Sequence, residues 1–102
     1  MTDITPEEVK QRLDAGEKLN LLDVREPYEN AEFNIGGRLL PIGKIQALQV
    51  EEIEDLKNEE VILYCRSGNR SGIGAMILDT LGFTNTKNLT GGMLSWQKKF
   101  RS

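Results

Sequence analysis

One short stretch, YCRSGNRSG at residues 64–72, contains the only cysteine of the chain, Cys65. A thiol at pH 7 is mostly protonated and weakly nucleophilic, but neighbouring cations and the start of a helix lower its pKa. Arg66 and Arg70 supply the cations, and a helical pattern begins near Ser71. We therefore interpret Cys65 as a reactive thiol, although a free cysteine standing alone is usually one more buried apolar residue.

The loop that follows the cysteine is predicted to form a nest of backbone amides. If the chain bends back after Cys65, successive N–H groups converge on the sulfur. Gly68 permits the tight turn, and the positive end of the following helix adds to the stabilisation of a thiolate or of an anion bonded to it. The amides expected to take part are those of Ser67, Gly68, Asn69, Arg70 and Ser71.

The two arginines of this stretch also have a plain interpretation. Either guanidinium is a solvated surface charge or pairs with an acid such as Asp23 or Glu26, and such pairs contribute little. For Arg66 this is as reasonable as a binding role. Arg70, which closes the loop, is the stronger candidate for binding an anion.

Composition excludes several kinds of protein. The 102 residues, of which 38% are hydrophobic and 28% charged, suit one globular domain over residues 1–102. The net charge of -3 gives no general attraction for nucleic acid or for an anionic membrane. The chain has no histidine and a single cysteine, so we expect no metal site, no Cys–His protease and no cofactor.

Location is predicted from cysteine usage and hydropathy. A lone cysteine forms no internal disulfide, and the first residues lack a basic segment followed by an apolar one. The apolar runs are far shorter than the roughly 20 residues that span a bilayer. We therefore predict a cytoplasmic protein without a membrane segment.

Strands and helices are predicted to alternate along the chain. Thr5, Pro6 and Glu8 form the pattern of a capped helix start. The predicted strands are residues 19–24, 38–42, 60–65 and 84–89. The run at 60–65 lacks polar alternation, which is typical of a central strand buried on both faces.

The remaining segments are predicted to be helical. Residues 46–60 are rich in helix formers, in one helix or two short ones. The spacing of Ile73, Met76, Ile77 and Leu81 predicts a helix that Gly82 ends, and Met93, Trp96 and Phe100 mark a last helix. This order indicates an α/β protein with a mostly parallel central sheet and helices on both faces. Ligand sites in such sheets lie beyond the carboxyl ends of the strands, where Cys65 is expected.

Four stretches, in this order, resemble the rhodanese (thiosulfate sulfurtransferase) homology domain in its single-domain form. They are LLDVREPYE at 21–29, VILYCRSGNRS at 61–71, AMILDTLGF at 75–83 and NLTGGMLSW at 88–96. The resemblance spans almost the whole chain and implies a three-layer rhodanese-like fold. It also implies that the Cys65 thiolate takes the outer sulfur of a small anionic donor such as thiosulfate. The resulting persulfide passes its sulfur to cyanide or to a thiol, including a thiol of a partner protein.

The resemblance also suggests roles for residues around the cysteine. It implies that the loop binds the donor, through Arg66, Ser67, Gly68, Asn69 and Arg70. Asp23, Arg25 and Ser71 are expected to support the site, Asp23 by capping or pairing and Arg25 by bracing the loop. Gly91 and Gly92 resemble a late glycine pair at the rim, and Trp96 is expected in the core.

One segment departs from the family pattern. Where the family often has Gly-His-Ile-Pro-Gly, residues 33–37 read FNIGG, so that Asn34 and Gly36 replace the histidine and the proline. The nucleophile is unaffected, but the shape of this loop, and with it the access of an acceptor, is expected to differ.

Two other functions remain open. A Cys-dependent phosphatase or arsenate reductase also binds an anion with a cysteine, a loop and an arginine. Only four residues separate Cys65 from Arg70, however, whereas the sites of those enzymes resemble a cysteine followed by five residues and then an arginine. A persulfide carrier or docking module would hand its sulfur to a specific partner protein. The acidic run of Glu51, Glu52, Glu54 and Asp55 is available to a partner, although it is more simply a solvated helix face.

Overall fold

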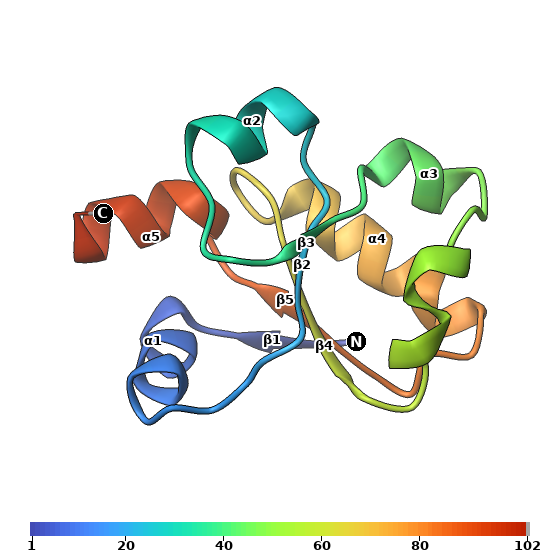
Figure 1. Cartoon of the computed structure of the whole chain (residues 1–102), viewed down its shortest axis with the longest axis horizontal. Coiled ribbons are helices and arrows are strands. Elements are labelled where there is room, and N and C mark those ends of the chain that lie inside the picture. Colours follow the sequence, from blue (N-terminus) through green and yellow to red (C-terminus); the bar gives the residue numbers. More distant parts are fainter. Residues whose placement is uncertain (102) are drawn as a thin grey trace.

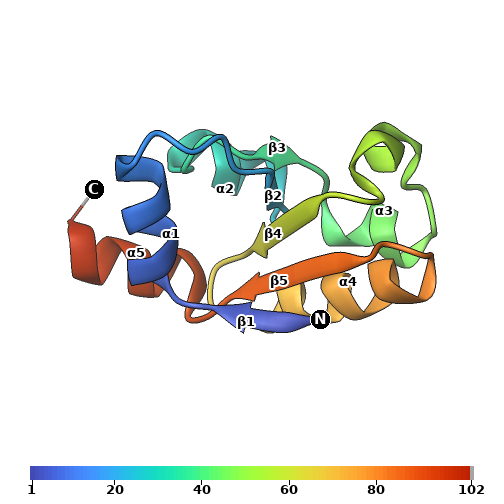
Figure 2. The same ribbon diagram turned by 90° about the horizontal axis from the view of Figure 1, so that it is seen from below.

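One sheet of five parallel strands lies between two layers of helices (Figures 1 and 2). The structure is a computed structural model and describes residues 1–101. The strands are β1 (Thr2–Ile4), β2 (Leu21–Asp23), β3 (Arg38–Leu39), β4 (Glu60–Tyr64) and β5 (Asn85–Leu89). The helices are α1 (Pro6–Asp14), α2 (Pro27–Glu32), α3 (Ile42–Gln46), the 3-10 helix η1 (Glu51–Leu56), α4 (Asn69–Thr80) and α5 (Gly92–Phe100). The predicted α/β class with helices on both faces is confirmed.

The strand order brings distant segments to one edge of the sheet. It runs β1-β5-β4-β2-β3, and every pair is parallel. In register, Asp23 lies opposite Tyr64, and Leu63 lies opposite Asn88. Because all carboxyl ends point the same way, the segments that follow β2, β4 and β5 meet beside Cys65.

The central strand β4 is buried on both faces, as its apolar run predicts. Val61 and Leu63 pack into the cluster beneath α3, η1 and α4, which also contains Cys65. Ile62 and Tyr64 pack into the opposite cluster, beneath α1 and α5. All four of these strand residues are fully buried. The alternation of strand side chains therefore supplies both cores from one strand.

Several predicted details are confirmed. Thr5 caps α1, where its hydroxyl accepts from the amide of Glu8 while the Glu8 carboxylate accepts from the amide of Thr5. Gly82 follows α4 with φ +94°, a conformation that favours glycine. Trp96 belongs to the core and contacts Phe100 edge-on, with 4.8 Å between the ring centroids.

The apolar stripe predicted for α4 is partly wrong. Ile73 and Met76 are 49% and 60% exposed. The buried face is made instead by small residues and one leucine: Ser71, Gly74, Ala75 and Leu78. A Cβ at Gly74 would lie 3.3 Å from the Leu63 side chain, so this glycine lets α4 lie close to the sheet.

Two short elements escaped prediction. β1 has three residues and pairs only with β5, which is too short a run to show alternation. α2 has no buried residue and therefore no apolar stripe. Its start was nevertheless signalled by Pro27 and by Glu29, whose carboxylate accepts from the amide of Glu26.

Two other boundaries differ from the prediction. The strand at 38–42 is reduced to Arg38–Leu39, because Pro41 leads into α3 at Ile42. Within the segment at 46–60, which is rich in helix formers, Leu48 has φ +61° and so interrupts the helical conformation. The 3-10 helix η1 begins after it, at Glu51. Residues 46–60 thus form no single long helix, because α3 ends at Gln46 and η1 is a short 3-10 helix with a kink at Ile53.

None of the helices within residues 1–101 combines the length and the apolar character needed to span a membrane.

The corrected face of α4 leads to a matched prediction. Leu78→Ala is expected to lower the free energy of unfolding by about 3 kcal/mol, because it leaves a cavity in a fully buried site. Met76→Ala, on the exposed face of the same helix, is expected to change it by less than about 0.5 kcal/mol. Urea unfolding of both variants measures the difference, and equal losses would contradict the assignment of the faces.

Candidate active site

Cys65 follows the last residue of β4 and is almost fully buried, with 1% of its surface exposed. Its sulfur accepts from the backbone amide of Gly68 at 3.0 Å and from that of Ser71 at 3.4 Å. The chain turns back through Gly68, whose φ of +102° suits glycine, and α4 begins at Asn69. The sulfur therefore lies at the amino end of α4, where unpaired N–H groups and the helix dipole favour an anion.

Hydrogen bonds between side chains connect this loop to β5. The Ser71 hydroxyl lies 3.4 Å from the sulfur and 2.5 Å from the Asn88 side-chain oxygen, to which it donates. The Asn88 amide group in turn donates to the Gly68 carbonyl at 3.1 Å. A hydroxyl has one proton and rotates, so we infer that Ser71 donates to Asn88 beside a neutral thiol and turns to the sulfur beside a thiolate.

The balance of these effects favours the thiolate. Burial raises the pKa of Cys65. Hydrogen bonds from the Ser71 hydroxyl and from the amides of Ser71, Gly68 and Ser67 together lower the pKa by more than burial raises it, so the net shift is downward. The sequence predicted a lowered pKa from the two arginines, from the loop amides and from the start of the following helix. In the structure hydrogen-bond donors provide the effect.

The amino end of α5 holds the other side of the loop. Its first amides, those of Met93 and Leu94, donate to the carbonyls of Cys65 and Arg66 at 2.9 and 3.0 Å. This approach requires Gly92, at φ +55°, where a Cβ would collide with both carbonyl oxygens. The peptides after β4 are thus fixed between two helix amino ends.

The two arginines of the loop have different surroundings. Both terminal nitrogens of Arg70 donate to the carboxylate of Glu29, at 2.8 and 2.9 Å. This contact lowers the pKa of Glu29 to about 2 and raises that of Arg70. Arg66 is exposed and takes part in none of the ion pairs found among residues 1–101.

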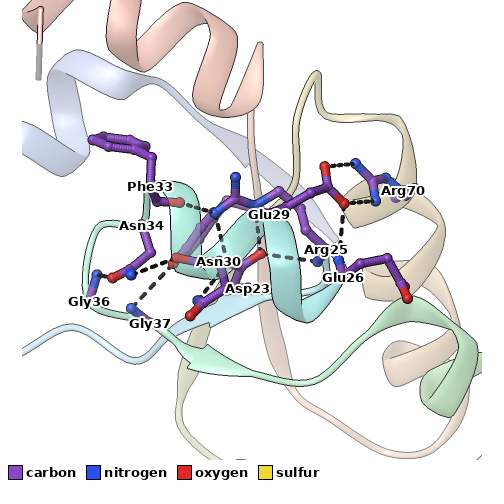
Figure 3. A network of polar contacts seen from close by, with 11 residues as sticks. Asp23, Arg25, Glu26, Glu29, Asn30, Phe33, Asn34, Gly36, Gly37 and Arg70 are labelled. Carbon is purple, nitrogen blue, oxygen red and sulfur yellow. Dashed lines mark hydrogen bonds and ion pairs between the residues drawn. The ribbon is translucent and has the colours of Figure 1, made fainter.

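Asp23 and Arg25 form a buried pair beneath α2 (Figure 3). The Asp23 carboxylate accepts from the amide and the guanidinium of Arg25, and also from the Asn30 side chain at 2.9 Å. Arg25 further donates to the Phe33 carbonyl at 2.6 Å. Burial has the largest single effect and lowers the pKa of Arg25, but the hydrogen bond to Asp23 and the charges of Asp23, Tyr64 and Glu29 together raise it. These contacts brace the segment after α2.

The departing segment at 33–37 is held by its own polar contacts (Figure 3). The Asn34 side chain accepts from the amide of Gly36 at 2.8 Å and donates to the Asn30 carbonyl at 2.9 Å. Gly36 has φ +94°, which suits glycine rather than proline. The amide of Gly37 donates to the Tyr64 hydroxyl at 3.3 Å. Asn34 and Gly36 therefore give this loop a turn of its own.

A cleft of about 220 Å³ lies beside the loop, between α2 and α5. Its lining includes Arg25, Glu29 and Glu32 on one side, Leu94 and Gln97 on the other, and Arg66. Through this cleft a ligand can approach the loop beside Arg66, the residue that follows Cys65. In the part of the chain that the structure describes, no three acidic or cysteine side chains gather in a way that would hold a metal ion.

The predicted residues are thus largely brought together, with two additions. Cys65, Gly68 and Ser71 form the sulfur cradle, while Ser67 and Asn69 lie exposed on the loop. Sequence reasoning missed Glu29 and Asn88. Both belong to the stretches that carried the family resemblance, and Asn88 is a polar residue at a partly buried strand position, which was a usable signal.

The acidic run of η1 lies away from this site. η1 precedes the amino end of β4, whereas Cys65 follows its carboxyl end (Figure 2). Its acids Glu52, Glu54 and Asp55 pair with nearby basic side chains. These are exposed contacts of a solvated face.

Comparison with known proteins gives a consistent family. The model of the rhodanese-like domain matches residues 5–99. The putative sulfur carrier protein YrkF of Bacillus subtilis is 35% identical over 98 residues, which cover 95% of this chain and 51% of YrkF. The putative sulfurtransferase YtwF of the same organism is 38% identical, over 93% of this chain and 89% of YtwF. A crystal structure of a rhodanese-like domain protein from Staphylococcus aureus superposes with a TM-score of 0.81 at 30% identity, covering 94% of this chain and 91% of that one.

The lengths of the relatives differ from that of this chain. It spans about half of YrkF and most of YtwF. The shared part is therefore a unit that occurs both nearly alone and within longer proteins.

The cradle predicts a pH effect of Ser71. In the native protein the lowered pKa gives Cys65 more thiolate near pH 7, so its alkylation by iodoacetamide is expected to reach half its maximal rate below the usual pH of a thiol. In Ser71→Ala the pKa rises and the profile moves to higher pH. The rate at pH 7 is expected to fall by about tenfold, since a hydrogen bond to a charged group contributes about 1.5 kcal/mol.

Ser67→Ala is the matched control, because Ser67 acts through its backbone amide, which the substitution retains. A Ser71→Ala profile identical to the native one would show that the hydroxyl proton stays with Asn88 and that amides alone hold the thiolate.

Gly92→Ala is expected to displace the loop. The new Cβ would meet the Arg66 carbonyl oxygen at 2.6 Å, and the left-handed backbone adds strain, so the free energy of unfolding should fall by about 2 kcal/mol. Gly43→Ala in α3 meets no atom within 4 Å and should raise it by about 0.5 kcal/mol. Thermal unfolding and the alkylation rate of Cys65 measure both effects. Native-like values for Gly92→Ala would argue against the fixation of the loop by the amino end of α5.

Proposed function

Because the chain belongs to the rhodanese-like domain family, we propose that it is a sulfurtransferase that carries a sulfane sulfur as a persulfide on Cys65. The observation that supports this most directly is the pair of backbone amides, of Gly68 and Ser71, that point at the sulfur of a buried cysteine. The names of the relatives, a sulfur carrier and a sulfurtransferase, agree with this class of chemistry.

The first step loads the cysteine. With thiosulfate, the Cys65 thiolate attacks the outer sulfur, a bond from Sγ to that sulfur forms, and the S–S bond of the donor breaks. Sulfite leaves with the electron pair, and Cys65 becomes a persulfide anion. No proton has to move, which suits a chain without histidine.

The second step unloads it. Cyanide or a thiolate attacks the terminal sulfur, the S–S bond to Sγ breaks, and Sγ leaves as the original thiolate. Cyanide becomes thiocyanate, and a thiol becomes a persulfide. The amides of the loop and the amino end of α4 stabilise the anion in both states, so the same cradle serves both half-reactions.

The loop residues are assigned roles on this basis. Arg66, exposed beside the cleft, attracts the anionic donor. Ser67, Gly68, Asn69 and Arg70 form the wall of the anion site through their backbone, since the Arg70 guanidinium is bound by Glu29. Ser71 orients the cradle. Asp23 and Arg25 support it from beneath α2.

Phosphate ester hydrolysis is supported less well. The loop between Cys65 and Arg70 is short, and both terminal nitrogens of Arg70 are occupied by the Glu29 carboxylate rather than free to bind a phosphate in the loop. No general acid of the histidine type exists in the chain.

A persulfide carrier is the second candidate, because this chain matches about half of a relative that is named as a putative sulfur carrier. A carrier would deliver sulfur to a partner thiol much faster than to cyanide. Comparing the two unloading rates of the loaded protein distinguishes the candidates.

The cytoplasmic location stays a prediction.

The loading step is tested by intact-protein mass. After incubation with thiosulfate, the native protein is expected to gain one sulfur atom, and Cys65→Ala none, because Cys65 is the only thiol. Cyanide should then remove the added sulfur and release an equal amount of thiocyanate. A native protein that stays unmodified by thiosulfate and by a persulfide donor, yet releases phosphate from an aryl phosphate, would replace this proposal by the hydrolytic one.

A further inference from the structure

Arg70, which sequence reasoning favoured as an anion ligand, is already bound to an anion within the protein. Glu29 on α2 accepts from both of its terminal nitrogens at 2.8 and 2.9 Å, in the paired geometry that arginine forms with carboxylates (Figure 3). The two residues are far apart in sequence, so this contact also ties α2 to the start of α4.

Glu29 is well fixed in this position. Its side chain is 13% exposed, and its carboxylate also accepts from the backbone amide of Glu26 at 3.0 Å. The bond to Arg70 lowers its pKa to about 2, so it is charged at neutral pH. A donor that uses the Arg70 guanidinium therefore has to compete with a bound carboxylate.

The charges around the site cancel. Three arginines and three carboxylates surround the loop and its cleft: Arg25, Arg66, Arg70, Asp23, Glu29 and Glu32. With Cys65 as a thiolate the balance becomes negative by one charge. A doubly charged donor thus approaches an anionic nucleophile with no net positive charge from the surrounding side chains, so that the loop amides and the amino end of α4 supply the attraction.

We propose that Glu29 is a positioning residue that occupies the guanidinium of Arg70 and thereby makes the site discriminate against doubly charged sulfur donors in favour of singly charged ones. This inference rests on the proposed sulfur transfer and adds a donor class to it. The favoured donors are those in which a sulfane sulfur is attached to a leaving group of lower charge than sulfite, such as a sulfinate or a thiolate.

The physical reason is that Coulomb energy scales with the charge of the ligand. Releasing Arg70 adds the same positive potential at the donor site for every donor, so a dianion gains twice the free energy of a monoanion. A tenfold gain in loading by a dianion therefore corresponds to about a threefold gain for a monoanion.

Thiosulfate and methanethiosulfonate provide a matched pair of donors. Both present a terminal sulfur on an oxidised sulfur atom, and the Cys65 thiolate breaks the same kind of S–S bond in each. Sulfite leaves from the first, methanesulfinate from the second, each with the electron pair. In Glu29→Gln, kcat/KM for thiosulfate is expected to rise about tenfold and that for methanethiosulfonate about threefold, so that their ratio rises about threefold.

This ratio separates positioning from mere structural support. A change in folding, or in the amount of thiolate, alters loading by both donors equally and leaves the ratio where it was. Glu29→Asp retains the charge and should keep the ratio near its native value. Thermal unfolding confirms that each variant is folded at the assay temperature.

Glu32→Gln is the charge-matched control. It removes the same charge from the same helix and lines the same cleft, but in the structure it is Glu29 that binds Arg70. The ratio in Glu32→Gln is expected to change by less than about twofold. An equal shift of the ratio in both variants would show that the effect comes from the loss of any negative charge on this helix, and would overturn the assignment to Glu29.

A second measurement needs no sulfur transfer. Iodoacetate is an anion and iodoacetamide is neutral, and both alkylate the same thiolate. The ratio of their rates is expected to rise about threefold in Glu29→Gln relative to the native protein. If neither sulfur donor loads Cys65, the proposed function fails while this ratio still decides the role of Glu29. Ratios that Glu29→Gln leaves unchanged, with loading intact, overturn only the role of Glu29.

Discussion

The hydrogen bonds from the amides of Gly68 and Ser71 to the Cys65 sulfur are the interaction on which the rest of the site depends. Burial alone would keep this thiol neutral, because desolvation disfavours the charged form. The Ser71 hydroxyl and the directed amides together reverse that tendency without placing a titratable group beside the sulfur. The cradle therefore works only if the loop backbone is held still.

Most of the surrounding structure restrains that backbone. The parallel sheet brings the segments after β2, β4 and β5 to one edge, and α5 binds the carbonyls of Cys65 and Arg66 through its first amides. Asn88, on the neighbouring strand, binds both the Gly68 carbonyl and the Ser71 hydroxyl. Contacts from α5 and from β5 thus fix this short loop.

Electrostatics acts in a second layer around the cradle. Two arginines follow the cysteine, yet one is neutralised by Glu29, and Arg25 is neutralised by Asp23. Bidentate pairs of this kind fix side-chain positions and reduce the net field at the same time. The site therefore combines strong local stabilisation of an anion with little long-range attraction for highly charged ligands.

The sequence alone was sufficient for the class of the fold, for the central strand and for the place of the cysteine at the end of that strand. The unbroken apolar run before Cys65 marks a strand buried on both sides, and glycines and caps mark the ends of α1 and α4. The position of the cysteine between that strand and a helix implied the anion nest. These features are local, so their signals lie within a few neighbouring residues.

Contacts between distant residues were decided only by the tertiary structure. The exposed face of α4 could not be told from its buried face, because small residues rather than large apolar ones pack against the sheet. Arg70 matched an anion ligand by type and spacing, but its partner Glu29 lies 41 positions earlier. The sequence thus determined which groups the loop itself contributes near the sulfur. Which of their charges remain free depends on the packing of α2 against the loop, because pairing is a property of positions in space.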